Sequence, residues 1–345
     1  MSKVPATAED PGIPHPRETS VLFGHADAER SLLDAYRSGA MPHAWLIGGP
    51  AGIGKATLAY RMARFVFAHP NPEAELAQQA TSLAVSPEHP AAHRVASQAH
   101  PDLLILQRTA SDSGALRTVI VVDDTRRTIK FFGSTAGEGG WRICIVDTAD
   151  ELNRSSANAL LKVIEEPPVR TLFFLISHMP GRLLPTIRSR CRRLSLRSLS
   201  PEDTLQALAT AAPEAEAAQR AEAAAGADGS VARALSLLDD RARRLRKQVS
   251  GMLERIPAID AAAMHVLGDQ LAGTDPAPLA AFLDAVQHWL SAQLESPVVD
   301  RRRLARYAQV WEKIGAAARD VEVYNLERKP LVFTVFESLS EAARA

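Results

Sequence analysis

The fold is decided by the stretch Trp141–Arg193, which reads WRICIVDTADELNRSSANALLKVIEEPPVRTLFFLISHMPGRLLPTIRSRCRR. Two apolar runs in it, 143–146 and 171–177, are rich in strand-forming residues and show little alternation of apolar and polar side chains. This pattern is typical of strands that are buried on both faces of a sheet. A helical segment separates the two runs, and the connections are short. Strand, helix and strand in this order form a βαβ unit, so the sheet is predicted to be parallel.

The helical segment carries its own start and stop signals. Asn153 or Ser155 can cap its first turn through a side-chain oxygen. Apolar residues then recur at helical spacing over 157–164. Pro167 and Pro168 follow, and proline ends a helix because it lacks the backbone N–H. A helix between the cap and the two prolines is therefore predicted.

Asp147 directly follows the first apolar run. It is expected at the carboxyl end of a buried parallel strand, which is the edge where such sheets bind ligands. Two interpretations are open. Paired with a phosphate-binding loop upstream, Asp147 is the acid on the metal side of a nucleotide site. Alone, it only caps the helix that follows.

A phosphate-binding loop is present upstream as GPAGIGKAT, residues 49–57. It satisfies the pattern G-x-x-x-x-G-K-[ST] up to the last position. Gly49, Gly52 and Gly54 allow backbone N–H groups to curl around phosphates, and the helix N-terminus that follows adds positive potential. Lys55 is expected to meet the β- and γ-phosphates. The loop is either a weak site for ATP or ADP or a fold element without a ligand.

The last position of the loop departs from the pattern. A Ser or Thr hydroxyl belongs there as a ligand of Mg²⁺, but the residue is Ala56. Thr57 comes one residue late, and one residue turns a helical side chain by about 100°. Thr57 is therefore not expected to replace the hydroxyl. The loop keeps its shape and loses a metal ligand.

Two phrases, NALLKVIEEPP (158–168) and TIRSRC (186–191), resemble the clamp-loader branch of the AAA+ ATPases. Within that branch the likeness is to the delta-prime family of the bacterial DNA polymerase III clamp loader. The pair His43-Ala44 and the phrase HPDL at 100–103 are similar to phrases of the same family. Long matched phrases of this kind are far more specific than a short motif.

The resemblance implies an α/β AAA+ P-loop domain with a parallel sheet flanked by helices, then a small helical lid domain and an all-α collar domain for oligomerisation. The expected division is a disordered leader at 1–19, the P-loop domain at 20–198 with an insertion at 69–100, the lid at 199–243 and the collar at 244–345. By itself the C-terminal sequence shows only amphipathic helices, whose apolar stripes could equally form an internal core.

Arg190 lies in the triplet Ser189-Arg190-Cys191, which corresponds to the SRC motif of the family. The resemblance implies that this arginine reaches across a subunit interface to the phosphates of a neighbour's ATP. Such a role is physically sensible, because an arginine supplied in trans neutralises charge that develops during phosphoryl transfer. Read without the family, Arg190 is one more arginine at a basic helix end.

Two further positions depart from relatives that hydrolyse ATP. Those relatives carry a Glu after the strand-end Asp to polarise the attacking water, whereas this chain has Thr148, which cannot act as that base. Asp150 and Glu151 are expected to turn away into the next loop. The resemblance also places a second sensor arginine on Ala232, with Arg233 one step off.

The insertion 69–100 is polar and rich in Pro and Ala. The delta-prime family commonly carries a four-cysteine zinc module here, but this insertion has no Cys. His89 and His93 are four residues apart, yet Pro90 argues against their sharing a helix face. A metal-free insertion is therefore expected, with no zinc.

The segments after the insertion have weaker signals. We expect a strand at 103–108, a loop at 109–118, a short strand at 119–122, a helix capped by Asp123 or Asp124, and a flexible glycine-rich connection at 133–140. The helix contains Arg126, in a phrase similar to one of the family.

Composition bounds the class of protein. The chain has 345 residues with 40 Lys+Arg and 40 Asp+Glu, so no global basic field draws it to nucleic acid. Hydrophobic residues make up 46% and charged residues 23%, a balance typical of globular proteins. Cys144 and Cys191 form no disulfide framework and fit a reducing cytoplasm, where we expect the protein. No apolar run approaches the roughly 18 residues of a membrane span.

The residues and the resemblance together favour a non-hydrolysing subunit of the DNA polymerase III clamp loader. It would sit in a ring-like heteropentamer with gamma/tau ATPase and delta subunits and complete a neighbour's ATP site with Arg190. The sliding clamp and primed DNA would be reached through the complex, with no membrane, no required cofactor and no activity of the chain alone. Two alternatives are an active AAA+ ATPase, with Thr57 or a water replacing the missing hydroxyl, and a nucleic-acid binding protein acting alone.

Overall fold

The computed structural model describes residues 15–110, 117–133, 140–273, 275–295, 301–324 and 326–344. The chain divides into two compact units, the first ending at Leu235 and the second beginning at Ser236. The predicted lid, 199–243, spans this boundary, and the finer division into lid and collar stays a prediction.

The first unit holds a five-stranded parallel sheet with the order β2-β3-β4-β1-β5. Its strands are β1 (Ala44–Gly48), β2 (Leu103–Leu106), β3 (Arg142–Val146), β4 (Thr171–Ser177) and β5 (Arg192–Ser195). Every residue of β1, β3 and β4 is buried. The predicted parallel sheet is confirmed. These three strands are largely apolar because both faces of the sheet are covered.

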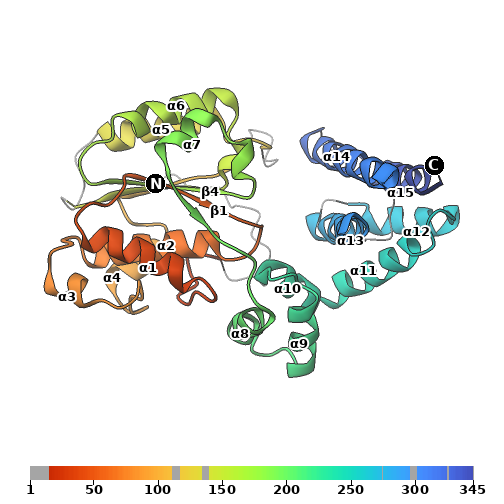
Figure 1. Ribbon diagram of the computed structural model, residues 1–345, viewed down its shortest axis with the longest axis horizontal. Coiled ribbons are helices and arrows are strands. Elements are labelled where there is room, and N and C mark those ends of the chain that lie inside the picture. Colours follow the sequence, from red (N-terminus) through yellow and green to blue (C-terminus); the bar gives the residue numbers. More distant parts are fainter. Residues whose placement is uncertain are drawn as a thin grey trace. The chain divides into compact units, whose positions relative to one another are not determined.

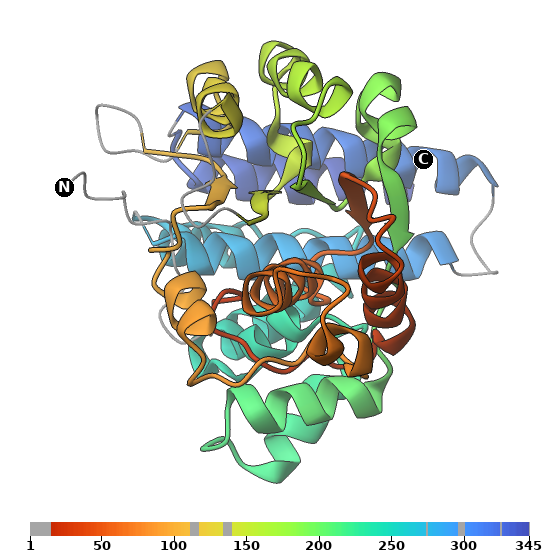
Figure 2. The same ribbon diagram turned by 90° about the vertical axis from the view of Figure 1, so that its left-hand side faces the viewer.

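Helices cover both faces of the sheet (Figures 1 and 2). On one face lie α1 (Ala26–Arg37), α2 (Lys55–Ala68), α3 (Glu75–Gln79) and α4 (Pro90–Ala96); on the other lie α5 (Val122–Gly133), α6 (Arg154–Glu165) and α7 (Pro185–Arg190). Successive residues of β1 show the alternation. Trp45 and Ile47 join the core beneath α1 and α2, whereas Ala44 and Leu46 join the core beneath α5, α6 and α7.

Helix α6 begins and ends where its signals predict. The Asn153 side chain accepts a hydrogen bond of 2.8 Å from the backbone N–H of Ser156, so Asn153 rather than Ser155 is the cap. The helix ends at Glu165, before the first proline of the pair.

The short strand predicted at 119–122 is wrong. Ile120 forms only an isolated bridge with Leu152, and helix α5 already begins at Val122. The run is not covered on both sides: Ile120 is buried, but Val122 is only partly so. Asp123 and Asp124 in the first helical turn favour a helix start there. Most of the loops predicted at 109–118 and 133–140 lies outside the described residues.

Residues 15–19 belong to the folded unit, although the leader was expected to extend through them. Buried Arg64 of α2 donates to the backbone carbonyl of Arg17 at 2.8 Å and to that of Thr19 at 2.5 Å. A buried guanidinium needs acceptors, and the N-terminal segment supplies them. Residues 1–14 of the predicted leader lie outside the described residues.

The insertion 69–100 is held by packing. Ala77, Leu83 and Val95 are buried in the core that contains α1 and α2. The Leu83 backbone N–H donates to the Glu29 carboxylate at 2.9 Å, which ties the insertion to α1. Among the described residues, no three or more His, Cys, Asp or Glu side chains are grouped so that they could hold a metal ion. The absence of zinc itself stays a prediction.

Helices joined by short connections make up the described part of the second unit. Its helices are α11 (Asp240–Leu253), α12 (Ala261–Leu271), α13 (Pro276–Glu295), α14 (Arg301–Tyr324) and α15 (Lys329–Arg344). The apolar stripes seen in the sequence, which include Leu267, Phe282 and Val286, form one internal core. The predicted helices are confirmed, and their stripes are used for packing within the unit. Helices α8 (Pro201–Ala211) and α9 (Ala217–Ala225) belong to the first unit. Helix α10 (Val231–Leu238) crosses the boundary between the two units.

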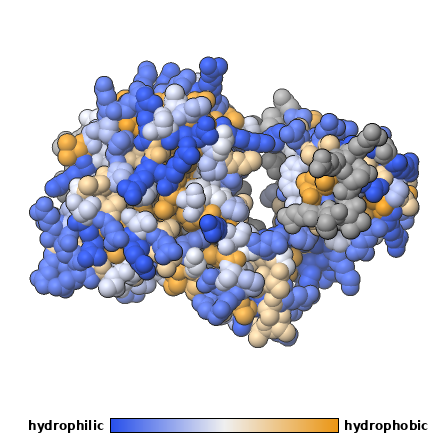
Figure 3. All heavy atoms as spheres, in the orientation of Figure 1, coloured by the Kyte–Doolittle hydropathy of each residue, from blue (hydrophilic) through white to orange (hydrophobic). Residues whose placement is uncertain are grey.

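Charged and polar side chains cover most of the face drawn in Figure 3. Among the large apolar side chains that the structure describes, Val169 and Leu76 are the most exposed. None of the described helices combines the length and the apolar character that crossing a bilayer requires.

The packing of the insertion predicts its response to substitution. Leu83→Ala should lower the free energy of unfolding by about 2–4 kcal/mol, because Leu83 is 1% exposed and its loss leaves a cavity. Leu76→Ala is the matched control: Leu76 is 71% exposed, and the change should cost less than about 0.5 kcal/mol. Urea unfolding monitored by circular dichroism measures both.

The same assay tests the expectation that the insertion is free of zinc. Incubation with EDTA should leave the unfolding midpoint of the wild-type chain unchanged, because apolar contacts hold the insertion in place. A midpoint that falls with EDTA and is restored by zinc would contradict the metal-free insertion.

Candidate functional site

Three chain segments meet at one edge of the sheet. Strand β4 lies between β1 and β3, and all three run parallel. Their carboxyl ends therefore bring together the phosphate-binding loop after Gly48, Asp147 after β3 and His178 after β4. The backbone N–H of Gly49 donates to the carbonyl of Ser177 at 3.2 Å, which fastens the loop to the end of β4. The predicted juxtaposition of the loop and Asp147 is thus present.

The loop has the backbone that its glycines permit. Gly52 and Gly54 have φ values of 74° and 99°, in the region that favours glycine. A Cβ on Gly52 would lie 2.2 Å from the Ser230 hydroxyl oxygen, so glycine is also needed for the close approach of α10. The backbone N–H of Val231 donates to the Gly52 carbonyl at 2.9 Å. The start of α10 therefore closes over the loop.

Lys55 turns back onto its own loop. Its ammonium group donates to the Gly49 carbonyl at 2.8 Å and to the Pro50 carbonyl. The side chain is buried, and burial lowers the pKa of Lys55 from 10.5 to about 8, although Asp147 and Asp150 act in the opposite direction. Lys55 is thus a cation held among backbone carbonyls in the place where a phosphate would be received.

Asp147 is the carboxylate that faces this cation. Burial raises the pKa of Asp147, while the positive charge of Lys55 and a hydrogen bond from the Thr148 side chain lower it. Thr148 is itself 9% exposed. The position after the strand-end acid is therefore filled by a hydroxyl that serves Asp147 and not by a free carboxylate.

The two nearby carboxylates have other partners. Asp150 accepts hydrogen bonds from the Ser177 hydroxyl at 2.7 Å and from the backbone N–H of His178 at 2.5 Å. Glu151 pairs with Arg108 at 3.0 Å. Asp150 does not turn away into the next loop, as the sequence suggested, but ties that loop to the end of β4. Both carboxylates are therefore engaged by other groups.

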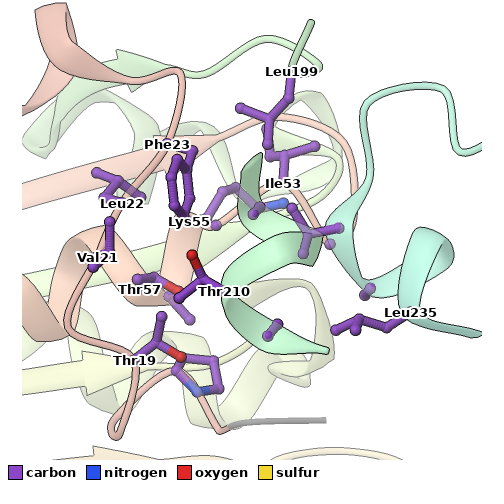
Figure 4. Close-up of a pocket in the computed structure, with 18 of the residues that line it drawn as sticks. Thr19, Val21, Leu22, Phe23, Ile53, Lys55, Thr57, Leu199, Thr210 and Leu235 are labelled. Atoms are coloured by element: carbon purple, nitrogen blue, oxygen red, sulfur yellow. The ribbon is translucent and has the colours of Figure 1, made fainter. Parts of the chain in front are cut away.

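A cavity of about 410 Å³ opens beside the loop (Figure 4). One wall is the loop and the strand ends, including Gly52, Gly54, Lys55 and Asp147. The facing walls come from the N-terminal segment 16–23 and from helices α8 and α10. The labelled residues of Figure 4 are Thr19, Val21, Leu22, Phe23, Ile53, Lys55, Thr57, Leu199, Thr210 and Leu235. The walls are mostly apolar, with Lys55, Asp147 and Glu18 as their charged residues. Such a pocket can take a ligand with an apolar body and a polar end that meets Lys55.

The facing walls were not predicted as site residues. Val21, Phe23, Leu199 and Leu235 come from three separate segments, and none belongs to a short motif. The only local signal is the apolar run before Gly24, which gives no indication of a ligand. Sequence reasoning found the phosphate end of the cavity and missed its apolar end.

Both residues after Lys55 line the cavity. Ala56 offers no hydroxyl for a metal ion, and Thr57 is 9% exposed. Ala232 also lines the cavity, whereas Arg233 is paired with Asp228 and is not among the lining residues. The residues present fit an anionic ligand at Lys55 and lack the metal ligand at the usual loop position.

Arg190 lies elsewhere. It is the last residue of α7 and is not among the residues that line the cavity. Ile187 and Cys191 are buried against the sheet, while Arg190 faces outward with its side chain 39% exposed. Its guanidinium pairs with Glu165 at 2.8 Å. The structure therefore places Gly52, Gly54, Lys55 and Asp147 around the cavity. Gly49 is bonded to Ser177 and is outside the cavity lining, and Arg190 is exposed on α7.

A family model described as DNA polymerase III, delta subunit, matches residues 24–200, which is more than half of the chain. The chain belongs to this family. The delta-prime resemblance inferred from the SRC and EEPP phrases is confirmed for the matched part. The second unit lies outside the match.

Three bacterial DNA polymerase III subunits are similar in sequence to this chain. A protein of Pseudomonas aeruginosa named DNA polymerase III subunit delta′ is 35% identical over 207 residues, 60% of this chain and 59% of that protein. The delta′ subunit of Escherichia coli K12 is 34% identical over 161 residues, 47% of this chain and 44% of that protein. The gamma/tau subunit of Mycobacterium tuberculosis H37Rv is 31% identical over 198 residues, 56% of this chain and 31% of that protein. Each match spans less than two thirds of the relative.

Solved structures show more distant likeness. A protein from Thermotoga maritima related to the DNA polymerase III gamma subunit has 15% identity and a TM-score of 0.42, covering 91% of this chain and 100% of that one. RuvB from the same organism has 19% identity and a TM-score of 0.44, covering 90% of each chain. Neither likeness bears on the site.

The lowered pKa of Lys55 predicts a pH dependence of stability. Between about pH 8 and 10.5 the unfolded chain binds a proton that the folded chain has released, so the contribution of Lys55 to stability rises with pH over this window. Relative to Lys55→Met, the wild-type chain should gain about 1–2 kcal/mol from pH 7.5 to pH 10.5, after allowance for solvent screening.

Urea unfolding of both chains at several pH values measures this difference. Groups that do not interact with Lys55 titrate equally in both chains and cancel. Asp147 does interact with it, so both chains carry Asp147→Asn in this comparison. A difference that stays constant over the window would show that Lys55 keeps its ordinary pKa in the folded chain.

Proposed function

We propose that the chain is a non-hydrolysing subunit of a DNA polymerase III clamp loader, in which Arg190 completes the ATP site of a neighbouring ATPase subunit. In this role it works in an assembly with gamma/tau-type ATPase and delta subunits that opens a sliding clamp and places it on primed DNA. The role needs neither zinc nor a nucleotide in the chain's own cavity. The observation that carries the proposal is the contrast between a deficient cavity and an exposed Arg190.

The deficiency of the cavity supports the absence of turnover. Hydrolysis of ATP needs a metal ion to bridge the phosphates and a group that positions the attacking water. Ala56 removes the hydroxyl that would hold the metal ion, and Thr148 replaces the carboxylate that would act on the water. Asp150 and Glu151 are engaged by other groups and cannot substitute.

The position of Arg190 supports action on another chain. The guanidinium is exposed and is not among the residues around the chain's own cavity, so it does not serve this chain's own loop. Helix α7 is anchored by buried Ile187 on one side and is followed by buried Cys191. A short anchored helix that ends in an exposed arginine can present its charge to the phosphates of an adjacent subunit.

The comparisons support the same assembly. The family match covers the part of the chain that contains both the loop and α7. Relatives with similar sequences carry the names of delta′ and of gamma/tau subunits, so both kinds of subunit share this architecture. The loss of the metal ligand and the base, with Arg190 kept, favours the helper role over the motor role.

Arg190→Ala should abolish fast hydrolysis at the one ATP site next to α7. Loss of an arginine finger lowers the rate of phosphoryl transfer by about 10³-fold or more. In single-turnover hydrolysis by the reconstituted assembly with clamp and primed DNA, the fast phase should lose the amplitude of one site. Arg190→Lys should not restore it, because an ammonium group cannot make the bidentate contact of a guanidinium.

The matched control is Arg193→Ala, which removes an exposed arginine from β5 three residues away. It should leave the fast phase intact. Unchanged DNA-stimulated hydrolysis in an assembly that carries Arg190→Ala would overturn the proposed role of this residue.

One observation favours a second function. Thr57 and Lys55 both line the cavity. An active AAA+ ATPase that uses Thr57 or a water in place of the missing hydroxyl would bind Mg²⁺-ATP and hydrolyse it alone. Hydrolysis by the isolated chain separates the two functions.

A further inference from the structure

A carboxylate from a different helix holds the guanidinium of Arg190. Nη2 of Arg190 lies 2.8 Å from Oε1 of Glu165, the last residue of α6. The other terminal nitrogen, Nη1, donates to the Thr186 carbonyl at 3.2 Å and to the Ser189 hydroxyl at 3.4 Å. The side chain is therefore fixed from two directions, by its own helix and by α6.

Glu165 is not placed for the stability of its own helix. The C-terminal end of a helix carries partial negative charge, so a carboxylate in the last turn is unfavourable there. The pair with Arg190 adds little to the stability of the fold either, because the two side chains are 39% and 44% exposed. The contact is better explained by its effect on the orientation of Arg190.

An arginine that acts in trans loses side-chain conformational entropy when it binds a phosphate. Its long side chain has many rotamers, and it must adopt one of them to meet a phosphate. A guanidinium has five N–H donors, and the three contacts of Arg190 leave at least two donors for a ligand. A carboxylate that fixes one edge of the fork in advance leaves the remaining edge oriented for binding.

We infer that Glu165 is a positioning residue for Arg190. The inference rests on the proposed action of Arg190 at a neighbour's ATP site. Glu165 holds the guanidinium at the end of α7 in the orientation in which its remaining N–H groups meet the transferred phosphoryl group. Because charge at that group develops in the transition state, the loss of Glu165 should affect the rate of hydrolysis more than the binding of ATP.

A double-mutant cycle in the reconstituted assembly tests the inference. Glu165→Gln keeps the size of the side chain and removes its charge. It should lower the single-turnover rate at the affected site by about 10-fold, with the KM for ATP changed less than about 2-fold. Combined with Arg190→Ala, it should cause no further loss, since a residue that acts only through Arg190 has nothing left to position.

The neighbouring Glu166 provides the control. It is exposed, lies one residue further along and carries the same charge. Glu166→Gln makes the same change of net charge and should leave the rate unchanged. The unfolding midpoint of Glu165→Gln should be close to that of the wild-type chain, since solvent reaches both side chains of the pair and screens their attraction.

The outcomes separate this inference from the function on which it rests. If Arg190→Ala has no effect, the trans role fails and the inference fails with it. If Arg190→Ala slows hydrolysis but Glu165→Gln does not, only the inference fails. A further loss when Glu165→Gln is added to Arg190→Ala would show that Glu165 acts elsewhere. A faster rate in Glu165→Gln would show that it restrains Arg190. Either result overturns the positioning role.

Discussion

Strand β1 pairs in parallel with β4 on one edge and with β5 on the other, and its five residues are buried on both faces. This strand lies inside the sheet and determines where the phosphate-binding loop begins. Its carboxyl end carries the phosphate-binding loop, and the pairing with β4 brings Ser177 against that loop. Strand β3 on the far side of β4 adds Asp147 at the same edge. The short α7 leads directly into β5, so the anchoring of Arg190 also depends on the pairing of β1.

The sequence predicted the parts of the fold in which local signals and burial agree. Strands β1, β3 and β4 are apolar runs with both faces covered, and α6 has a cap at Asn153 and prolines after its end. Prediction from the sequence failed where contacts with distant segments determine the structure. Ile120 has the composition of a strand residue but finds only a single bridge partner. Residues 15–19 look like a leader and are ordered by Arg64, more than forty residues away.

The candidate site shows the same limit. The residues at its phosphate end belong to one continuous loop, so Gly52, Gly54 and Lys55 could be identified from their spacing alone. Its apolar end is built from the segment 16–23 and from helices α8 and α10, and nothing in those segments marks them as neighbours of the loop. The engagement of Asp150 by Ser177 could not be read from spacing either, because it depends on how the loop after β3 folds back.

The proposed function depends on Ala56 and Thr148 at the cavity and on the exposed Arg190 outside it. ATP hydrolysis by the purified chain alone, with Mg²⁺ and with Lys55→Ala as control, tests the proposed function most directly. We expect no turnover by either protein, whether or not ATP binds weakly. Turnover by the wild-type chain that Lys55→Ala abolishes would contradict this expectation, and would show that the chain is itself a motor despite Ala56 and Thr148.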